Sequence, residues 1–196
     1  MSFVDRFLGH FAKHKDFSRP SKFEVEIYLG GKLEGGRSPL QNVLPIPYDL
    51  KFQCEAAELP GYNFDTVEGR IYGAPYAVAA RPAFNDLRLT FICSGDLWEK
   101  RFFDTWQEFI MPKNNYLVKY RDEYVTNLKV FQYLDMADSK GDDATGENVK
   151  PKRSYIAEFI EAFPTSIEPI TLTWADDNIS RLAVTFKYNF WRSIEV

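Results

Sequence analysis

Residues 159–191, FIEAFPTSIEPITLTWADDNISRLAVTFKYNFW, decide the fold class. Apolar and polar side chains alternate on both sides of Pro164 and Pro169, which is the two-residue period of half-buried β-strands. The pattern predicts a strand that ends near Pro164, a short strand PITLTW, and a last strand SRLAVTFKYNFW. One face of the last strand is expected to carry Leu182, Val184, Phe186, Tyr188 and Phe190.

An acidic pair, Asp176 and Asp177, lies between the last two predicted strands and precedes Asn178. Asp and Asn favour turns, because their side chains bond nearby backbone groups and tolerate left-handed conformations. A catalytic or metal-binding carboxylate pair would need a neighbouring base, a pocket or further ligands, and no histidine lies near in the sequence. We therefore interpret this segment as a turn.

The same alternation recurs in four other segments and predicts a strand in each. These segments are KFEVEIYL at 22–29, YDLKFQCEAAEL at 48–59, LRLTFICS at 87–94 and YVTNLKVFQYLD at 124–135. Residues 62–86 are expected to hold two short strands around Gly73. Most connections are too short for a crossover helix, so the strands are expected to pair antiparallel.

One internal helix is predicted between Asp96 and Pro112, which stops it. Asp96 with Glu99 three residues later is a variant of the capping box at a helix start. Aromatic and aliphatic residues at helical spacing give this helix one apolar face: Trp98, Phe102, Phe103, Trp106, Phe109 and Ile110.

The ends of the chain and its polar segments complete the expected layout. Residues 3–15 predict a short amphipathic helix that is too short to be stable unless it docks on another surface. Residues 30–47 and 135–153 are rich in turn-forming or charged residues and are expected to be long loops. The expected fold is mainly β: an antiparallel β-sandwich or open barrel with one packed α-helix and a short N-terminal helix, in a single domain over residues 1–196.

Composition restricts the classes of function. The net charge of −4 argues against wrapping nucleic acid by phosphate neutralisation. No apolar run approaches the length of a membrane span, and Asp5 and Arg6 interrupt the N-terminal run too early for a secretion signal. Cys54 and Cys93 lie inside predicted strands, which favours buried thiols and a cytosolic setting over a disulfide between them.

The sequence predicts no catalytic residue, cofactor or metal site. His10 and His14 have zinc-like spacing, but no third ligand is near, so a solvated helix face is favoured. The carboxylates at 138, 142, 143 and 147 do not follow the order of an EF-hand loop, which favours a solvated acidic loop over calcium binding. Sequence motifs of nucleotide-binding loops and hydrolase active sites do not occur.

Four segments together resemble the tail tube proteins of contractile-tailed bacteriophages. DFSRPSKFEVEI resembles that family's entry into its first strand, and LKFQCEAAELPG its second strand and turn. FNDLRLTFICSGD followed by RFFDTWQEF resembles its passage from strand to helix. Residues 159–191 resemble its closing pattern of an apolar strand, aromatic-Pro-Thr, a Leu-x-Trp strand, an Asp/Asn turn and a final strand.

The resemblance implies a structural virion protein and no enzyme. It implies a hexameric ring, in which the sheets of six copies close into one multi-subunit β-barrel, and a stack of rings that conducts double-stranded DNA without specific binding. Implied partners are the tail sheath protein, baseplate tube-initiator proteins and the tape measure protein, with assembly in the host cytoplasm. Loops 30–47 and 135–153 leave open a baseplate tube initiator or a related secretion-system or tailocin tube subunit.

Two sets of residues are candidates for these roles. Carboxylates on polar strand faces are expected to line the lumen and repel phosphates: Glu24, Glu26, Glu55, Glu158 and Glu161. Apolar residues of the N-terminal helix and the first long loop are candidates for contacts between subunits or rings, or alternatively pack inside the chain: Phe3, Phe7, Phe11, Leu40, Val43 and Leu44.

The high aromatic content also supports a function of another class, a monomeric ligand-binding β-barrel. Such a protein needs an internal cavity and remains a monomer at high concentration, so solution size separates it from a tube subunit.

Overall fold

The computed structural model describes most of the chain, in eight ranges. They are residues 4, 18–29, 39–45, 47, 49–70, 72–134, 153–175 and 177–195. The predicted helix 3–15 lies outside these ranges except for one residue, as do residues 30–38 and 135–152 of the two predicted long loops.

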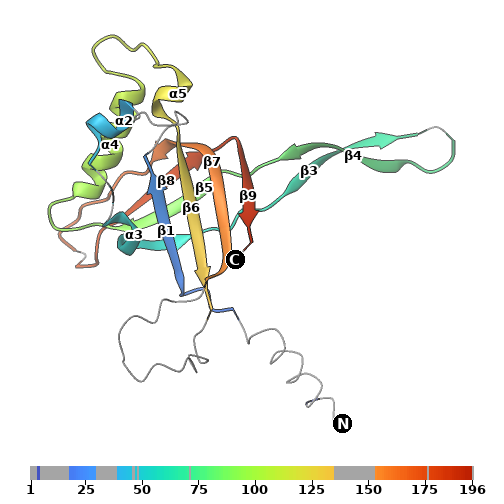
Figure 1. Ribbon diagram of the computed structural model, residues 1–196, viewed down its shortest axis with the longest axis horizontal. Coiled ribbons are helices and arrows are strands. Elements are labelled where there is room, and N and C mark those ends of the chain that lie inside the picture. Colours follow the sequence, from blue (N-terminus) through green and yellow to red (C-terminus); the bar gives the residue numbers. More distant parts are fainter. Residues whose placement is uncertain are drawn as a thin grey trace.

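Nine strands and four helices follow one another in the described part of the chain (Figure 1). In chain order they are β1 (Phe23–Tyr28), α2 (Pro39–Val43), α3 (Leu50–Gln53), β2 (Cys54–Ala57), β3 (Asn63–Gly69), β4 (Tyr76–Ala83), β5 (Leu87–Ile92), α4 (Trp98–Ile110), α5 (Arg121–Tyr124), β6 (Thr126–Tyr133), β7 (Arg153–Ile167), β8 (Arg181–Lys187) and β9 (Phe190–Ile194). The mainly β fold class predicted from the sequence is confirmed.

The long strand β7 belongs to two antiparallel sheets. Its first part pairs with β6 on one side and β9 on the other, and β1 extends this four-stranded sheet beyond β6. We call it the front sheet. From Phe163 to Ile167, β7 pairs instead with β8, which leads to β5 and β2 in the back sheet. The strand changes sheets next to Glu161, which has a left-handed φ of 57°.

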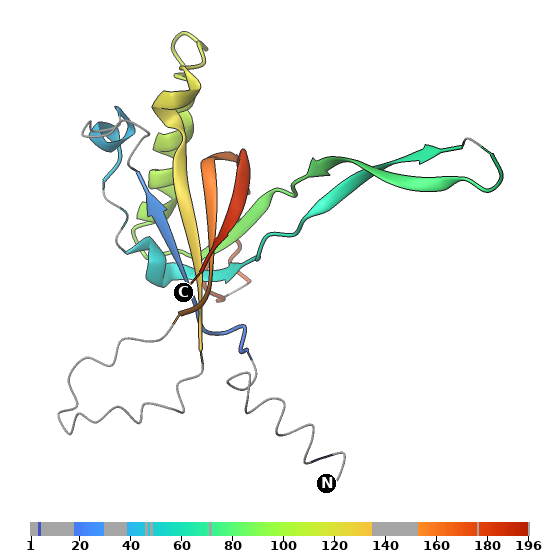
Figure 2. The ribbon, with the colours of Figure 1, turned by 45° about the vertical axis from the view of Figure 1, so that its right-hand side comes forward.

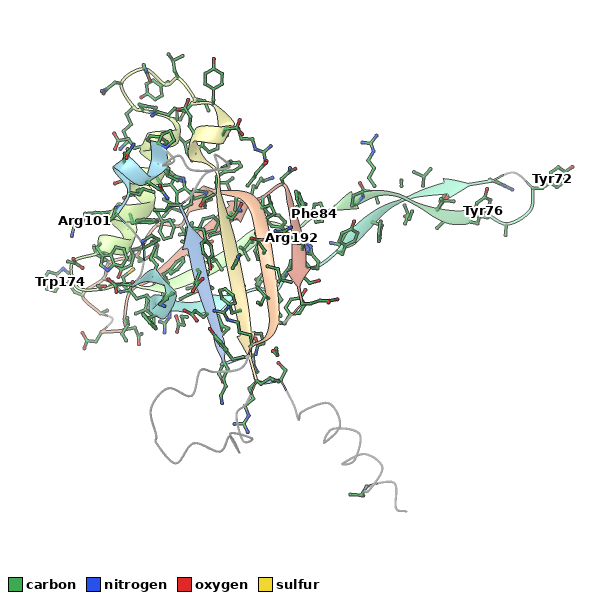
Figure 3. The ribbon with its side chains drawn as sticks, in the orientation of Figure 1. Tyr72, Tyr76, Phe84, Arg101, Trp174 and Arg192 are labelled. Carbon is green, nitrogen blue, oxygen red and sulfur yellow. The ribbon has the colours of Figure 1, made fainter. Side chains whose placement is uncertain are left out.

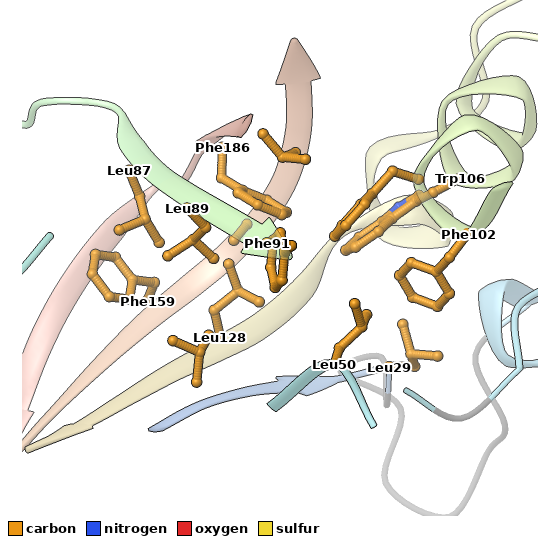
Figure 4. Close-up of a cluster of buried hydrophobic side chains, with 14 of the residues drawn as sticks. Leu29, Leu50, Leu87, Leu89, Phe91, Phe102, Trp106, Leu128, Phe159 and Phe186 are labelled. Carbon is orange, nitrogen blue, oxygen red and sulfur yellow. The ribbon is translucent and has the colours of Figure 1, made fainter. Parts of the chain in front are cut away.

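The two sheets and α4 enclose one apolar core (Figure 4). Leu87, Leu89 and Phe91 alternate along β5 with more exposed residues and point inward, which agrees with the half-buried strand predicted at 87–94. Trp106 of α4 is fully buried, and its indole N–H donates a hydrogen bond to the Tyr124 carbonyl at 3.0 Å. Large side chains therefore fill the space between the layers.

Helix α4 begins differently from the prediction. The capping position is Leu97, in a left-handed conformation with φ of 52°, and it has no side-chain capping bond. Glu99 does not complete a box with Asp96. Its fully buried carboxylate instead accepts hydrogen bonds from the backbone N–H of Ser94, at 3.1 Å to each oxygen, and from the Ser94 hydroxyl. Gln53 donates to the same hydroxyl at 2.8 Å.

Three predicted strands have other outcomes. Residues 50–53 form the short helix α3, which buries Leu50 in the core, so only Cys54–Ala57 remain a strand. The segment PITLTW forms no strand, because residues 171–174 are exposed and no neighbouring strand pairs with them. The predicted last strand is two strands, β8 and β9, which pair with different parts of β7.

The break between β8 and β9 changes which side chains share a face. Asn189 donates its backbone N–H to the Ile160 carbonyl at 3.0 Å, where the chain passes from the back sheet to the front sheet. Leu182, Val184 and Phe186 are buried as predicted, whereas Phe190 is exposed. The prediction that these residues continue on one face was wrong for Phe190.

The two cysteines are free thiols and only partly buried. Burial raises the pKa of Cys54 to about 12, because it penalises the thiolate. The pKa of Cys93 is also raised, first by burial and then by the nearby Glu99 carboxylate.

Candidate assembly interface

A row of alternating charges crosses the outer face of the front sheet. Strand register places Glu26 opposite Lys129, Lys129 opposite Glu158, and Glu158 opposite Arg192. Direct cross-strand neighbours share a face, and core residues of these strands occupy the other face. We call these four residues the charge row.

Glu158 is the centre of the charge row. It is only 5% exposed, yet two cations neutralise it: Lys129 Nζ lies 3.4 Å from one carboxylate oxygen, and the Arg192 guanidinium lies 2.6 Å from the other. Lys129 also lies 4.8 Å from the centre of the Tyr28 ring. A buried carboxylate needs such pairing, because an unpaired charge at this depth would be costly.

The β1 end of the row is acidic. Glu26 accepts a hydrogen bond from the Tyr28 hydroxyl, and partial burial together with this bond raises the pKa of Tyr28. Glu24 lies two residues earlier on the same face, 3.3 Å from Lys51 Nζ and bonded to the Tyr133 hydroxyl.

The front sheet ends in β1 on one side and β9 on the other, and neither has a second strand partner among the described residues. Strand β1 pairs with β6, and β9 pairs with β7. Each edge therefore presents backbone N–H and C=O groups that another strand can bind. The two edges run in opposite directions, because three antiparallel steps separate them.

A two-stranded hairpin, β3 and β4, projects far from the two sheets (Figures 1 and 2). Its apolar side chains are exposed, with Val67 opposite Val78, Tyr76 opposite Gly69, and Tyr72 at the tip. An isolated two-stranded hairpin is at best marginally stable in water. The hairpin is therefore a surface that a partner is expected to cover.

The base of the hairpin is attached to β9. The Tyr62 ring contacts the rings of Phe84 and Trp191 edge to face, with centres 5.4 and 6.5 Å apart. The Trp191 indole N–H donates to the Gly61 carbonyl at 3.3 Å. The orientation of the hairpin is thus fixed on the same side of the molecule as the β9 edge.

Two further exposed apolar segments lie away from the front sheet. One follows α4 and includes Tyr116, Leu117, Val118 and Tyr120. The other includes Leu172, Ile179 and Trp174, whose side chain is fully exposed (Figure 3). Exposed tryptophan and tyrosine side chains in groups are typical of contact surfaces.

A family model described as phage tail tube protein matches residues 18–194. The chain belongs to the phage tail tube protein family. This agrees with the family that the sequence segments resemble, and it identifies the chain as a structural component of the tail tube of a phage or injection particle. No protein of curated function has a sequence that matches the chain.

Solved structures of contractile injection particles share the fold of this tail tube protein. A chain of the anti-feeding prophage baseplate aligns with a TM-score of 0.61 at 10% identity, covering 91% of this chain and 95% of that chain. A chain of the extracellular contractile injection system PVC sheath-tube complex aligns with a TM-score of 0.57 at 12% identity, covering 100% and 99%. A chain of the PVC sheath/tube terminator aligns with a TM-score of 0.56 at 12% identity, covering 92% of this chain and 99% of that chain.

The tail tube protein brings three of the five candidate lumen carboxylates together. Glu24, Glu26 and Glu158 lie on the outer face of the front sheet. Glu55 lies on β2 of the back sheet, where Arg181 pairs with it through two nitrogens at 2.5 and 3.0 Å and holds its pKa below the usual value. Glu161 is buried at the bend of β7, 3.2 Å from Arg121.

The candidate contact residues are divided in a similar way. Leu40 and Leu44 are buried in the chain's own core, whereas Val43 between them is exposed. Phe3, Phe7 and Phe11 lie outside the described residues.

The hairpin and the two cations of the charge row were not among the predicted site residues. The two strands of the hairpin were predicted from the sequence. The charge row depends on strand register, and the alternation of polar and apolar residues does not give that register.

Other candidate sites give no group of ligands. Among the residues that the structure describes, no three His, Cys, Asp or Glu side chains gather in a way that could hold a metal ion. Asp177 is exposed beside the bend at Asn178, and Asp176, His10, His14 and the acidic residues at 138–147 lie outside those residues. In the same described ranges, no helix has the length and hydropathy needed to cross a membrane.

Proposed function

We propose that this protein is the subunit of the inner tail tube of a contractile phage tail, and that residues 1–196 form one tail tube domain. Six copies form a ring, rings stack, and the resulting channel conducts double-stranded DNA. The sheath binds outside, baseplate initiators begin the stack, and the tape measure protein is a further partner. Assembly takes place in the host cytoplasm.

The single observation that supports ring formation best is the pair of open front-sheet edges. Because the front sheet has an even number of strands, β9 of one copy runs antiparallel to β1 of a neighbour in the same orientation. Repeating this contact in a ring removes every exposed front-sheet edge.

The dimensions of such a ring suit duplex DNA. Six front sheets give a barrel of about 24 strands, and a spacing of ~4.8 Å with a tilt of ~40–45° gives a radius of roughly 25 Å. Side chains leave a bore of about 35–40 Å, which admits a duplex roughly 20 Å wide. We propose that the outer face of the front sheet, with Glu24, Glu26 and Glu158, faces this bore.

Contacts between copies are expected to use the exposed apolar surfaces. The hairpin leaves the molecule beside the β9 edge, so a neighbour bound at that edge can also cover the hairpin. The N-terminal residues Phe3, Phe7 and Phe11, together with Val43, remain candidates for contacts between stacked rings.

A baseplate tube initiator, or a tube subunit of a related injection system, is the second candidate. It is favoured by the alignment with a baseplate chain, whose TM-score is as high as that of the sheath-tube chain. Both candidates are structural and neither requires a catalytic site.

Light scattering and negative-stain electron microscopy of the purified protein test the proposal. Rings and long tubes with a central channel are expected for the main tube subunit. Rings that stop growing alone but seed tubes of another protein indicate the initiator. A strict monomer at high concentration overturns both.

A further inference from the structure

The charge row has opposite signs at its two ends. Glu26 lies on β1 at one edge, where Glu24 is already paired with Lys51, whereas Arg192 lies on β9 at the other edge. Between them, Lys129 and Glu158 continue the alternation. We propose that the charge row specifies which edges join: the basic β9 edge of one copy binds the acidic β1 edge of the next. This inference rests on the proposed ring.

Strand polarity alone does not select this contact. Two β9 edges, or two β1 edges, can also pair antiparallel when one molecule is turned over, and that two-fold contact gives a dimer whose copies have opposite orientations and cannot belong to the same ring. Pairing of like edges would bring Arg192 near Arg192, or Glu26 near Glu26. Like charges at close range weaken such pairs, so the charges disfavour the dimer and favour the head-to-tail contact.

The contact does not require one fixed register. Arg and Glu side chains on adjacent strands reach both the facing and the diagonal position on the same face. Arg192 can therefore meet Glu26 of the next copy from either position while it keeps its contact with Glu158, whereas Glu24 is already paired with Lys51 of its own copy. With β9 and β1 joined, plus and minus charges alternate around the whole circumference.

The alternation of charges changes the expected charge of the bore. The charge row contributes two carboxylates and two cations per copy, so this level of the wall is balanced rather than acidic. Its cations are engaged by carboxylates within the wall, in particular by Glu158. Passing phosphates then find neither a strong field nor free cations to bind.

Two charge-reversed variants test the inference. Glu26→Lys makes both edges basic, and Arg192→Glu makes both edges acidic. We expect each variant alone to need about tenfold or more protein than the wild type for half-assembly, measured by light scattering and electron microscopy. An equimolar mixture is expected to form rings again, because each edge then finds its opposite in an alternating ring with an even number of copies.

Glu108→Lys is the matched control, since Glu108 is an exposed carboxylate on α4 away from the edges. It is expected to assemble as the wild type does. Circular dichroism checks the fold of each variant. Arg192→Glu removes one partner of Glu158 and could unfold the chain for that reason. In that case Glu26→Lys tests the inference, because it leaves Glu158 with both of its cations.

If the wild type forms rings and Glu26→Lys assembles equally well, the charge-row inference is overturned and the proposed function is left intact. Failure of the mixture to restore rings from two folded variants also overturns it. Absence of rings from the wild type itself overturns the proposed function, and the inference with it.

Discussion

The Tyr76 ring lies across the backbone of Gly69 in the facing strand, where a methyl group on Gly69 would be only 2.9 Å from the Tyr76 Cζ atom. The aromatic ring thereby covers a strand residue that has no side chain of its own to pack. This contact sets the apolar surface that the projecting hairpin offers to a partner.

Gly69→Ala is expected to displace the Tyr76 ring and to weaken assembly several-fold, while the free energy of unfolding changes by less than about 0.5 kcal/mol. The ring end of Tyr76 moves at little cost in the monomer because the hairpin is exposed. Gly95→Ala is the control, since Gly95 lies in the turn between β5 and α4 and nothing lies within 4 Å of its added methyl group. Light scattering compares the two variants, and equal assembly would contradict a contact role for this surface.

Glu99→Ala is expected to destabilise the chain by about 1–3 kcal/mol, because it leaves the buried N–H and hydroxyl of Ser94 without their acceptor. Urea unfolding measures the loss. Glu108→Ala on the exposed face of the same helix is expected to change the unfolding free energy by less than about 0.5 kcal/mol. Similar losses for both variants would show that the Ser94 contact contributes little.

The two tryptophans Trp106 and Trp174 are expected to differ strongly on truncation. Trp106→Ala empties a buried site and should cost about 3–5 kcal/mol of unfolding free energy. Trp174→Ala removes a fully exposed side chain and should leave the monomer's stability unchanged within about 0.5 kcal/mol. A large loss for Trp174→Ala in urea unfolding would contradict its exposed position.

Cys54 is expected to react slowly with iodoacetamide while the chain is folded. Its pKa of about 12 keeps the thiol protonated at pH 8.5, whereas unfolding returns it to its ordinary range. A Cys93→Ser variant isolates this thiol, and we expect at least tenfold faster alkylation in urea. Because the pKa of Cys54 is higher in the folded chain than in the unfolded chain, the free energy of unfolding should fall as the pH rises from about 9 toward 12. Equal rates would refute the shift.

Local periodicity explains why most strands were predictable. Leu87, Leu89 and Phe91 alternate because one face of β5 is buried, and that pattern is visible without knowing any partner strand. The change from β8 to β9 was not visible, since Tyr188 and Phe190 keep the same period while the chain moves to another sheet. A two-residue period shows that one face of a strand is buried, but it does not show which strand lies next to it.

The candidate site was less predictable for a related reason. Glu26 and Glu158 could be placed on polar strand faces, but their cations Lys129 and Arg192 became neighbours only through register between strands distant in sequence. Helix α4 shows the same limit: a carboxylate near its start was expected, whereas its donor, Ser94, depends on how the preceding turn folds.

The bent strand β7 has a mechanical consequence. Because one continuous backbone from Arg153 to Ile167 is shared by both layers, a force applied to the outside of the subunit reaches its inner layer through covalent bonds as well as side-chain packing. Sliding one layer over the other would require breaking β7 pairing on both sides of Glu161. In the proposed ring, such a subunit is suited to keep the channel open when a surrounding shell shortens.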